Sequence, residues 1–328
     1  MRTELSEQPR HPQVALERQA INGPTMGTRY SVVFYAPSST DRDSLRRDLQ
    51  AAVDAVDAQM STWKPDSDLM RLNRAATGLW CDVPAQLGTV LAAALEIGRL
   101  SEGTFDIGVG DLVSAWGFGS TPAPADQVRV ARHDLGTRQP AHLCLELDLE
   151  ALRVRKRSAV TLDLSGIAKG FGVDELARVL MSHGIMHFLA SIDGELRGSG
   201  GKPDGTPWRV AVERPTPGSR EAMGVVELID GAVATSGDYR HFVEIDGVRY
   251  AHTIDPRRHE PLSDGPAAVT VLAETCMAAD AWATALLILG PVAGGAVAAR
   301  QGLEALFIAH PGHPAQGLAH PATFTKEN

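Results

Sequence analysis

The stretch LDLSGIAKGFGVDELARVL, residues 162–180, begins as the end of a strand, passes through a turn of small residues and continues as a helix. Apolar residues recur every three or four positions between Val173 and Leu180, and we expect the helix to end before Gly184. Lys169 lies in the first turn, where the helix dipole disfavours a cation unless an anion is near. The stretch predicts either one wall of an anion site or an exposed lysine on a tight turn.

This turn matches no standard phosphate loop. Only two residues separate Gly166 from Lys169, and Gly170 with Phe171 follows the lysine in place of the hydroxyl residue of a Walker loop. The GxGxxG spacing of a dinucleotide-binding fold is also absent from the stretch. The small residues nevertheless leave the backbone amides at the start of the helix accessible to an anion.

Strands and helices alternate irregularly through the rest of the chain, which predicts an α+β fold of mixed or antiparallel sheets with packed helices. Asp246-Gly247, between two strand-like runs, is a strong hairpin signal, and Gly290-Pro291 is expected to stop the last helix. The expected helices cover residues 44–59, 85–99 and 276–289, and the expected strands cover residues 29–36, 143–148, 152–156, 187–193, 208–213, 240–245, 248–254, 267–273 and 303–309.

The composition of the 328 residues, with 44% hydrophobic and 22% charged, is that of a globular protein. A net charge of -9 argues against a nucleic-acid partner, which would require a cationic face. Three scattered cysteines suggest neither a zinc site nor a disulfide framework. We expect flexible tails at residues 1–20 and 311–328 around one domain at residues 21–310.

The first residues are polar and charged and have no apolar core of a signal peptide, and the apolar run AWATALLILG is too short to span a bilayer. The sequence as written therefore predicts a cytoplasmic protein that does not span a membrane. If a leader has been omitted, the prediction becomes a periplasmic, membrane-anchored protein.

Eight segments follow one another in a fixed order. They are MGTRYSVV from Met26, STWKPDSDLMRLN from Ser61, GTFDIGVGDLVSAWGFG from Gly103, LDLSGIAKGFGVD from Leu162, DGELRGSG from Asp193, AVATSGDYRHF from Ala232, YAHTIDP from Tyr250 and CMAADAWATALLILG from Cys276. Together they resemble the ApbE family of FAD-dependent FMN transferases, over residues 21–309. The resemblance implies a single α+β domain of two lobes, related to the T-fold.

The resemblance also implies the residues of a site. Asp280 and Thr284 are four apart on a predicted helix, so they share a face, and their hard oxygen atoms suit Mg²⁺. Without the resemblance, a capped buried aspartate and a threonine bonded to its own helix would be the better explanation of the pair. The implied flavin contacts are Met26, Trp63, Thr104, Phe105, Asp106, Asp163 and Lys169, with His252 and Thr253 beside the diphosphate, and the implied metal ligands are the Gly166 carbonyl, Asp280 and Thr284.

The implied reaction is Mg²⁺-dependent transfer of the FMN moiety of FAD to a threonine or serine hydroxyl of an acceptor flavoprotein, with release of AMP. Lys169, Asp280 and His252 are the candidate catalytic residues; His252 either takes the hydroxyl proton or only hydrogen-bonds phosphate. The implied acceptor carries an Asp-Gly-Ala-Thr-like segment and belongs to an electron-transfer or maturation system. Two alternatives remain open, namely an FAD pyrophosphatase and a non-catalytic FAD-binding protein.

Two departures from the family pattern affect this site. Asp193 stands where the family commonly has glycine, and its carboxylate should weaken binding of an anion unless it points away. Arg257, Arg258 and His259 replace a segment that normally contains a turn glycine. That substitution leaves the turn geometry open and adds two positive charges that could hold a phosphate or a protein substrate.

Overall fold

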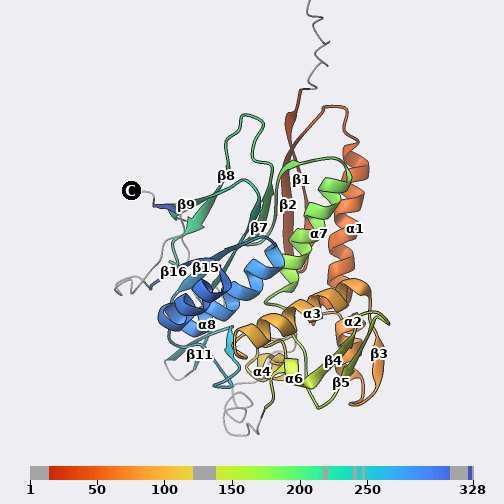
Figure 1. Cartoon of the computed structure of the whole chain (residues 1–328), viewed down its shortest axis with the longest axis vertical. Helices are drawn as coiled ribbons and strands as arrows, with labels where there is room; N and C mark the ends of the chain where they lie inside the picture. The colour runs from red at the N-terminus through yellow and green to blue at the C-terminus, as the bar shows by residue number, and fades with distance from the viewer. Residues whose placement is uncertain are drawn as a thin grey trace, which may run out of the picture.

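A seven-stranded sheet forms the centre of the computed structural model, and each strand is antiparallel to its neighbours (Figure 1). The structure describes residues 15–120, 138–216, 221–238, 242–245, 248–310 and 324–326. In spatial order the strands are β1 (Glu17–Thr25), β2 (Thr28–Ala36), β6 (His187–Ile192), β7 (Glu195–Ser199), β10 (Gly231–Gly237), β15 (Ala268–Ala273) and β16 (Glu304–Ile308).

The first two strands form a hairpin that ends in a turn of two residues. Met26 and Gly27 have positive φ angles of 43° and 72°, which is the backbone geometry of a tight hairpin turn that follows the twist of its strands. The sequence did not predict β1, which begins at Glu17 rather than at the expected domain start at residue 21. The hairpin places Met26 at its tip.

Three helices cover one face of this sheet: α7 (Ala168–Ser182) packs on β6 and β7, α8 (Cys276–Gln301) packs on β10, β15 and β16, and α1 (Arg42–Met60) packs on α7. The predicted helices at residues 44–59 and 276–289 are confirmed as parts of α1 and α8. Gly290 interrupts α8 with a φ of 73° and a ψ of 176°, and Pro291 starts a second helical segment. The expected stop is therefore a kink.

A second sheet covers part of the opposite face. Its strands, in spatial order, are β17 (Phe324–Lys326), β9 (Ala222–Leu228) and β8 (Trp208–Glu213). Trp208 and Val212 of this sheet form one apolar cluster with Val233 and Leu306 of the central sheet. Residues 324–326, predicted to lie in a flexible tail, thus pair with β9, whereas residues 311–323 lie outside the described residues.

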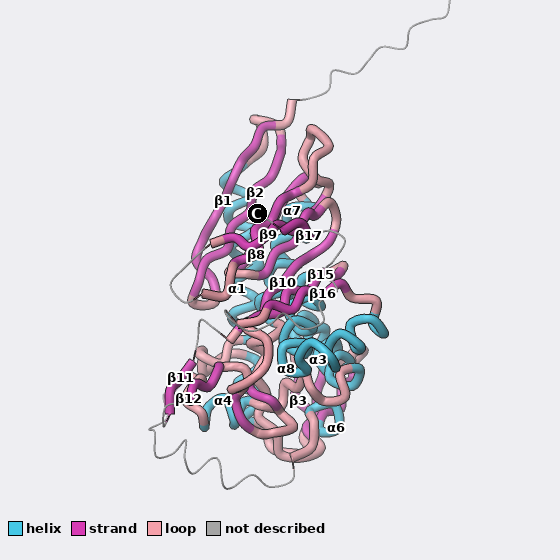
Figure 2. Tube along the Cα trace, turned by 90° about the vertical axis from the view of Figure 1, so that its left-hand side faces the viewer, coloured by secondary structure: helices cyan, strands magenta, loops and turns pink. Residues whose placement is uncertain are grey.

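The lower half of the molecule holds helix α3 together with short helices and small strand pairs (Figure 2). The two predicted hairpins are confirmed as β4 with β5 and β11 with β12. Residues 143–144, predicted as strand, belong to helix α6 instead, β12 ends at Ala251, and residues 240–241 and Asp246-Gly247 lie outside the described residues. With the central sheet, the two hairpins confirm the α+β prediction. The elements are α2 (Asp68–Arg74), β3 (Trp80–Asp82), α3 (Ala85–Leu100), α4 (Gly110–Ala115), α6 (Ala141–Cys144), β4 (Leu145–Asp148), β5 (Arg153–Lys156), β11 (Phe242–Ile245), β12 (Val248–Ala251), β13 (Ile254–Asp255) and β14 (Glu260–Pro261).

By length and composition α8 is apolar enough to cross a membrane. However, 56% of its most apolar stretch is buried inside the fold, as is usual for the core helix of a domain. The helix is thus weak evidence for a membrane span, and the cellular compartment stays a prediction of the sequence.

Helices α7 and α8 approach each other closely at Gly170. A side chain there would place its Cβ 2.3 Å from the carbonyl oxygen of Cys276 and 2.8 Å from Cβ of Asp280. The Gly170 amide also donates a hydrogen bond of 2.9 Å to Oδ2 of Asp280. Only glycine allows this approach, and the approach brings Lys169 beside Asp280.

We predict that Gly170→Ala destabilises the fold by about 3 kcal/mol, because the added methyl group forces two packed helices apart. Gly295→Ala is the matched control in α8, where a Cβ meets nothing within 4 Å, and it should be neutral or stabilising by up to about 1 kcal/mol. Urea unfolding of both variants measures the difference. Equal effects of the two substitutions would contradict the packing argument.

Candidate active site

One cavity of about 980 Å³ lies where the two halves of the molecule meet, and all twelve predicted site residues line it. They come from the tip of the first hairpin, the segments after α1 and α3, the segment before α7 and its first turn, the segment after β12 and the first half of α8. The residues are Met26, Trp63, Thr104, Phe105, Asp106, Asp163, Gly166, Lys169, His252, Thr253, Asp280 and Thr284.

Lys169 is held on the cavity wall by carboxylates. Its Nζ lies 2.7 Å from Oε1 of Glu195 and 3.6 Å from Oδ2 of Asp193. These anions explain why a cation is tolerated in the first turn of α7. The carboxylate of Asp193 faces the site, so we still expect it to weaken the binding of an anionic ligand.

The charges of this group perturb one another. Burial lowers the pKa of Lys169, but the carboxylates of Glu195 and Asp280 outweigh it and raise the pKa above its usual range. Burial, with a contribution from Asp280, raises the pKa of Glu195 to about 7 although Lys169 opposes the shift. Burial also raises the pKa of Asp280. The ammonium therefore stays charged at neutral pH.

The proposed metal ligands lie on adjoining walls of the cavity. A Cβ added to Gly166 would be 3.2 Å from Oγ1 of Thr284, which in turn lies 3.1 Å from Oγ of Ser236. Asp280 is 4% exposed, and its Oδ2 accepts the Gly170 amide. A carbonyl, a carboxylate and a hydroxyl are hard donors that fit Mg²⁺.

The described part of the chain holds no cluster of three or more His, Cys, Asp or Glu residues able to bind a metal ion. Among the three predicted metal ligands, Gly166, Asp280 and Thr284, only Asp280 contributes a carboxylate. Mg²⁺ commonly uses one or two carboxylates and fills its other positions with water and substrate phosphate oxygens. The donor set therefore fits a metal ion that is bound together with a phosphate substrate.

Aromatic and sulfur-containing side chains line another part of the cavity. Trp63 is 66% exposed, and Phe105 is buried beneath the cavity surface. The Met26 side chain reaches α7, since a Cβ added to Gly172 would lie 2.9 Å from its Cε. An exposed indole with nearby polarisable side chains is a surface on which a flat heteroaromatic ring can stack.

Asp106 and Asp163, two of the predicted ligand contacts, also form hydrogen bonds that stabilise the loops around the cavity. Oδ1 of Asp106 accepts backbone amides from Gly108 at 2.8 Å and Ala141 at 2.9 Å, and burial raises the pKa of this carboxyl group. Oδ1 of Asp163 accepts the amide of Ser165 at 2.7 Å. Both carboxylates shape the cavity wall, and their contact with a ligand stays a prediction.

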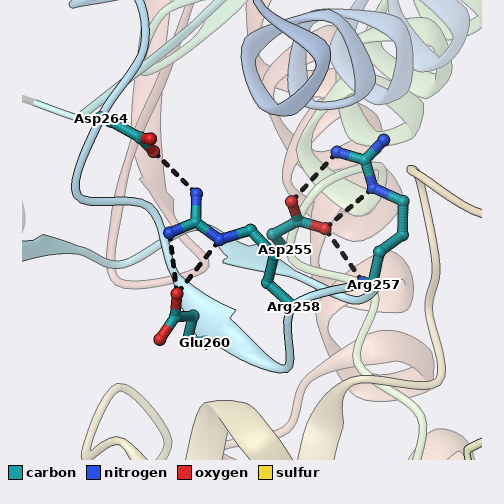
Figure 3. Close-up of polar contacts among 5 residues, drawn as sticks. All are labelled: Asp255, Arg257, Arg258, Glu260 and Asp264. Atoms are coloured by element: carbon teal, nitrogen blue, oxygen red, sulfur yellow. Dashed lines mark hydrogen bonds and ion pairs between the residues drawn. The ribbon is translucent and has the colours of Figure 1, made fainter.

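The turn after His252 and Thr253 is held by two separate ion-pair groups (Figure 3). Buried Asp255 accepts the Arg257 amide at 2.9 Å and pairs with its guanidinium at 3.0 Å and 3.1 Å. Arg258 pairs with Glu260 at 2.7 Å and with Asp264 at 2.8 Å.

These pairs correct the expectation for the two arginines. Arg257 and Arg258 are neutralised within the turn, so they do not supply free positive charge for a phosphate. His259 has a φ of 58° and takes the left-handed position for which a glycine would be the usual residue. The turn is thus built by ion pairs in place of a glycine.

A sequence model described as the ApbE family matches residues 26–307. This chain belongs to the ApbE family. A relative from Vibrio cholerae serotype O1, named FAD:protein FMN transferase, is 38% identical over 89% of this chain and 87% of its own length. The flavin transferase ApbE from Vibrio cholerae has a TM-score of 0.79 at 36% identity, covering 90% of this chain and 94% of its own. The apo flavinyl transferase ApbE from Pseudomonas stutzeri has a TM-score of 0.78 at 36% identity, covering 91% and 93%.

Family membership confirms the resemblance, but the ApbE motifs alone did not identify every residue of the cavity. Glu195 lies within a recognised motif, yet its contact with Lys169 joins residues 26 positions apart. Ser236 likewise lies in a recognised motif and meets Thr284 only through folding. The family motifs could therefore point to Glu195 and Ser236 as site residues. The side chains that these two residues contact are revealed only by the tertiary structure.

We predict that Asp255→Ala loosens the turn of this ApbE-family site. It removes a buried acceptor of three hydrogen bonds and should cost about 1–3 kcal/mol of stability. Arg258→Ala breaks only more exposed pairs and should cost at most about 1 kcal/mol. Thermal unfolding and hydrogen exchange over residues 252–262 compare them, and faster exchange in the Arg258 variant alone would refute this account.

We also predict a pH-dependent contribution from Glu195. Its folded-state pKa of about 7 exceeds its ordinary value of 4.5, so its contribution is present below pH 4.5 and is lost as the pH rises through 7. From pH 5 to pH 8, the wild type should lose about 1–3 kcal/mol of stability relative to Glu195→Gln. Urea unfolding of both proteins at the two pH values measures this, and a constant difference would contradict the prediction.

Proposed function

We propose that this chain is an FAD:protein FMN transferase that moves the FMN moiety of FAD to a serine or threonine hydroxyl of an acceptor protein, with Mg²⁺. The main observation in support of this proposal is that Lys169 and the oxygen donors of Gly166, Asp280 and Thr284 line one cavity in a chain of the ApbE family. At about 980 Å³ the cavity lies at the upper end of ordinary ligand sites, which suits a dinucleotide. The names of the relatives support the same activity.

In the proposed reaction, the acceptor oxygen attacks the riboflavin-side phosphorus of FAD. A new phosphorus–oxygen bond forms, and the bond from that phosphorus to the bridging oxygen breaks. AMP leaves with the bridging oxygen. Lys169 supplies positive charge to the phosphoryl oxygens, which is the usual way in which proteins assist phosphoryl transfer.

Gly166, Asp280 and Thr284 are the residues that would hold Mg²⁺ beside the diphosphate. The ion would neutralise charge on the phosphate oxygens and help to orient them. Trp63, Met26 and Phe105 line the part of the cavity that would receive the flavin ring. These roles are the ones that the resemblance to the ApbE family implies, and they are supported by the placement of side chains of suitable chemistry around one cavity.

His252 is our candidate for the group that takes the hydroxyl proton, because an imidazole titrates near neutral pH. Its side chain lines the cavity next to Thr253. His252→Gln keeps a hydrogen-bond donor but cannot accept the proton in the same way. If His252 acts as the base, transfer should fall about 100-fold or more in this variant. Near-normal transfer would instead assign it a phosphate-binding role.

The decisive experiment follows FMN attachment by mass spectrometry. The purified chain is incubated with FAD, Mg²⁺ and a carrier protein fused to an Asp-Gly-Ala-Thr segment, and the flavin mass is sought on that threonine. Asp280→Asn and Thr284→Val should each lower transfer about 100-fold. Thr89→Val, on the exposed face of α3, is the matched control and should keep full activity.

The same assay separates the two alternatives. Rapid release of FMN and AMP without acceptor would favour an FAD pyrophosphatase. Tight FAD binding with neither product, in the presence of acceptor and Mg²⁺, would favour a non-catalytic FAD-binding protein. Full activity of Asp280→Asn with unchanged Mg²⁺ dependence would refute the proposed metal site.

A further inference from the structure

Lys169 has two carboxylate neighbours in unlike surroundings. The side chain of Glu195 is 4% exposed and lies 2.7 Å from the ammonium, whereas that of Asp193 is 46% exposed and lies 3.6 Å away. An ammonium group has three donors, so it can serve more than one anion at a time. The two carboxylates therefore need not respond equally when an anionic ligand arrives.

The ion pair between Glu195 and Lys169 is costly to break. Its Oε2 is buried, and no described residue forms a hydrogen bond with it. Loss of the contact between Oε1 and Lys169 would leave an uncompensated buried carboxylate, which costs far more than separating an exposed ion pair. Glu195 is thus a fixed anchor for the ammonium.

Asp193 lies in a tight turn beside the ammonium of Lys169. Ile192 pairs with Glu195 across the strands β6 and β7, which leaves Asp193-Gly194 as a two-residue turn. The φ of Asp193 is 54°, a left-handed value that aspartate and asparagine tolerate better than most residues. Both turn residues line the cavity. The turn thus presents a half-exposed carboxylate that can exchange its partner for water.

We propose that Glu195 keeps Lys169 in place while Asp193 competes with the diphosphate of a bound dinucleotide for the free side of the ammonium. Asp193 is then a positioning residue that acts through Lys169 and lowers the affinity for diphosphate ligands. The inference rests on the proposed function in one respect, namely that the ligand is FAD. Asp193, which is not among the predicted metal ligands or flavin contacts, then helps to set the affinity for FAD.

The test is a titration with FAD at pH 8 and fixed Mg²⁺, followed by flavin fluorescence. Asp193→Asn keeps the size of the side chain and its tolerance of the left-handed turn but removes the charge. The Kd for FAD should fall about two- to five-fold, as expected for loss of one partly exposed ion pair. The Kd for riboflavin, which has no diphosphate, should stay unchanged.

A second background separates competition from simple repulsion. In Lys169→Met combined with Glu195→Gln, the buried pair is neutralised as a unit, so no buried charge is left alone. Adding Asp193→Asn there should change the Kd for FAD by a clearly smaller factor than in the wild type. An equal change would show that Asp193 repels the diphosphate directly and would overturn the proposal.

Weaker or unchanged FAD binding by Asp193→Asn in the wild-type background would also overturn it, as would an equal change for riboflavin. FMN transfer to the Asp-Gly-Ala-Thr carrier is measured in parallel with binding. Tighter FAD binding by Asp193→Asn without transfer by any variant would refute the proposed function and still support the role of Asp193.

Discussion

The close approach of α7 and α8 at Gly170 is the contact on which the site depends. The Gly170 amide bonds to Asp280, and the lack of a side chain allows the helices to meet. Asp174 of α7 reinforces the contact, because its two carboxylate oxygens accept the amides of Cys276 and Met277 at the start of α8. One helix thus caps the other, and their register brings Lys169 and Asp280 together.

That register forces several charged groups into a place with little water. Each charge is tolerated because another compensates it: Glu195 neutralises Lys169, and Lys169 in turn limits how far burial raises the pKa of Glu195 and Asp280. The seven-stranded sheet contributes by carrying Glu195 at the start of β7 and Ser236 in β10. The ammonium of Lys169 is therefore held in a fixed place on the cavity wall before a ligand binds.

Local patterns were sufficient to predict much of this arrangement. The apolar spacing of α1 and of α7 follows directly from burial of one helix face, and the motif order located twelve residues that the fold brings into one cavity. Strand β1 was missed because its buried positions include Gln19 and Gly23, which break the apolar alternation. The roles of Glu195, Arg257 and Arg258 could not be predicted, since an ion pair depends on which side chains meet after folding.

The charge of the cavity wall gives a further reason to pair the substrate with a metal ion. Its acidic lining residues are Asp106, Asp163, Asp193, Glu195, Glu213 and Asp280. Its lysine and arginine lining residues are Lys169 and Arg209. Arg257 and Arg258 are already neutralised within their own turn. A diphosphate entering such a cavity meets a net negative wall, and one ammonium shared with Glu195 does not offset it. A divalent cation held by Asp280 and Thr284 would reverse the local sign, so we expect the metal and the diphosphate to favour each other's binding.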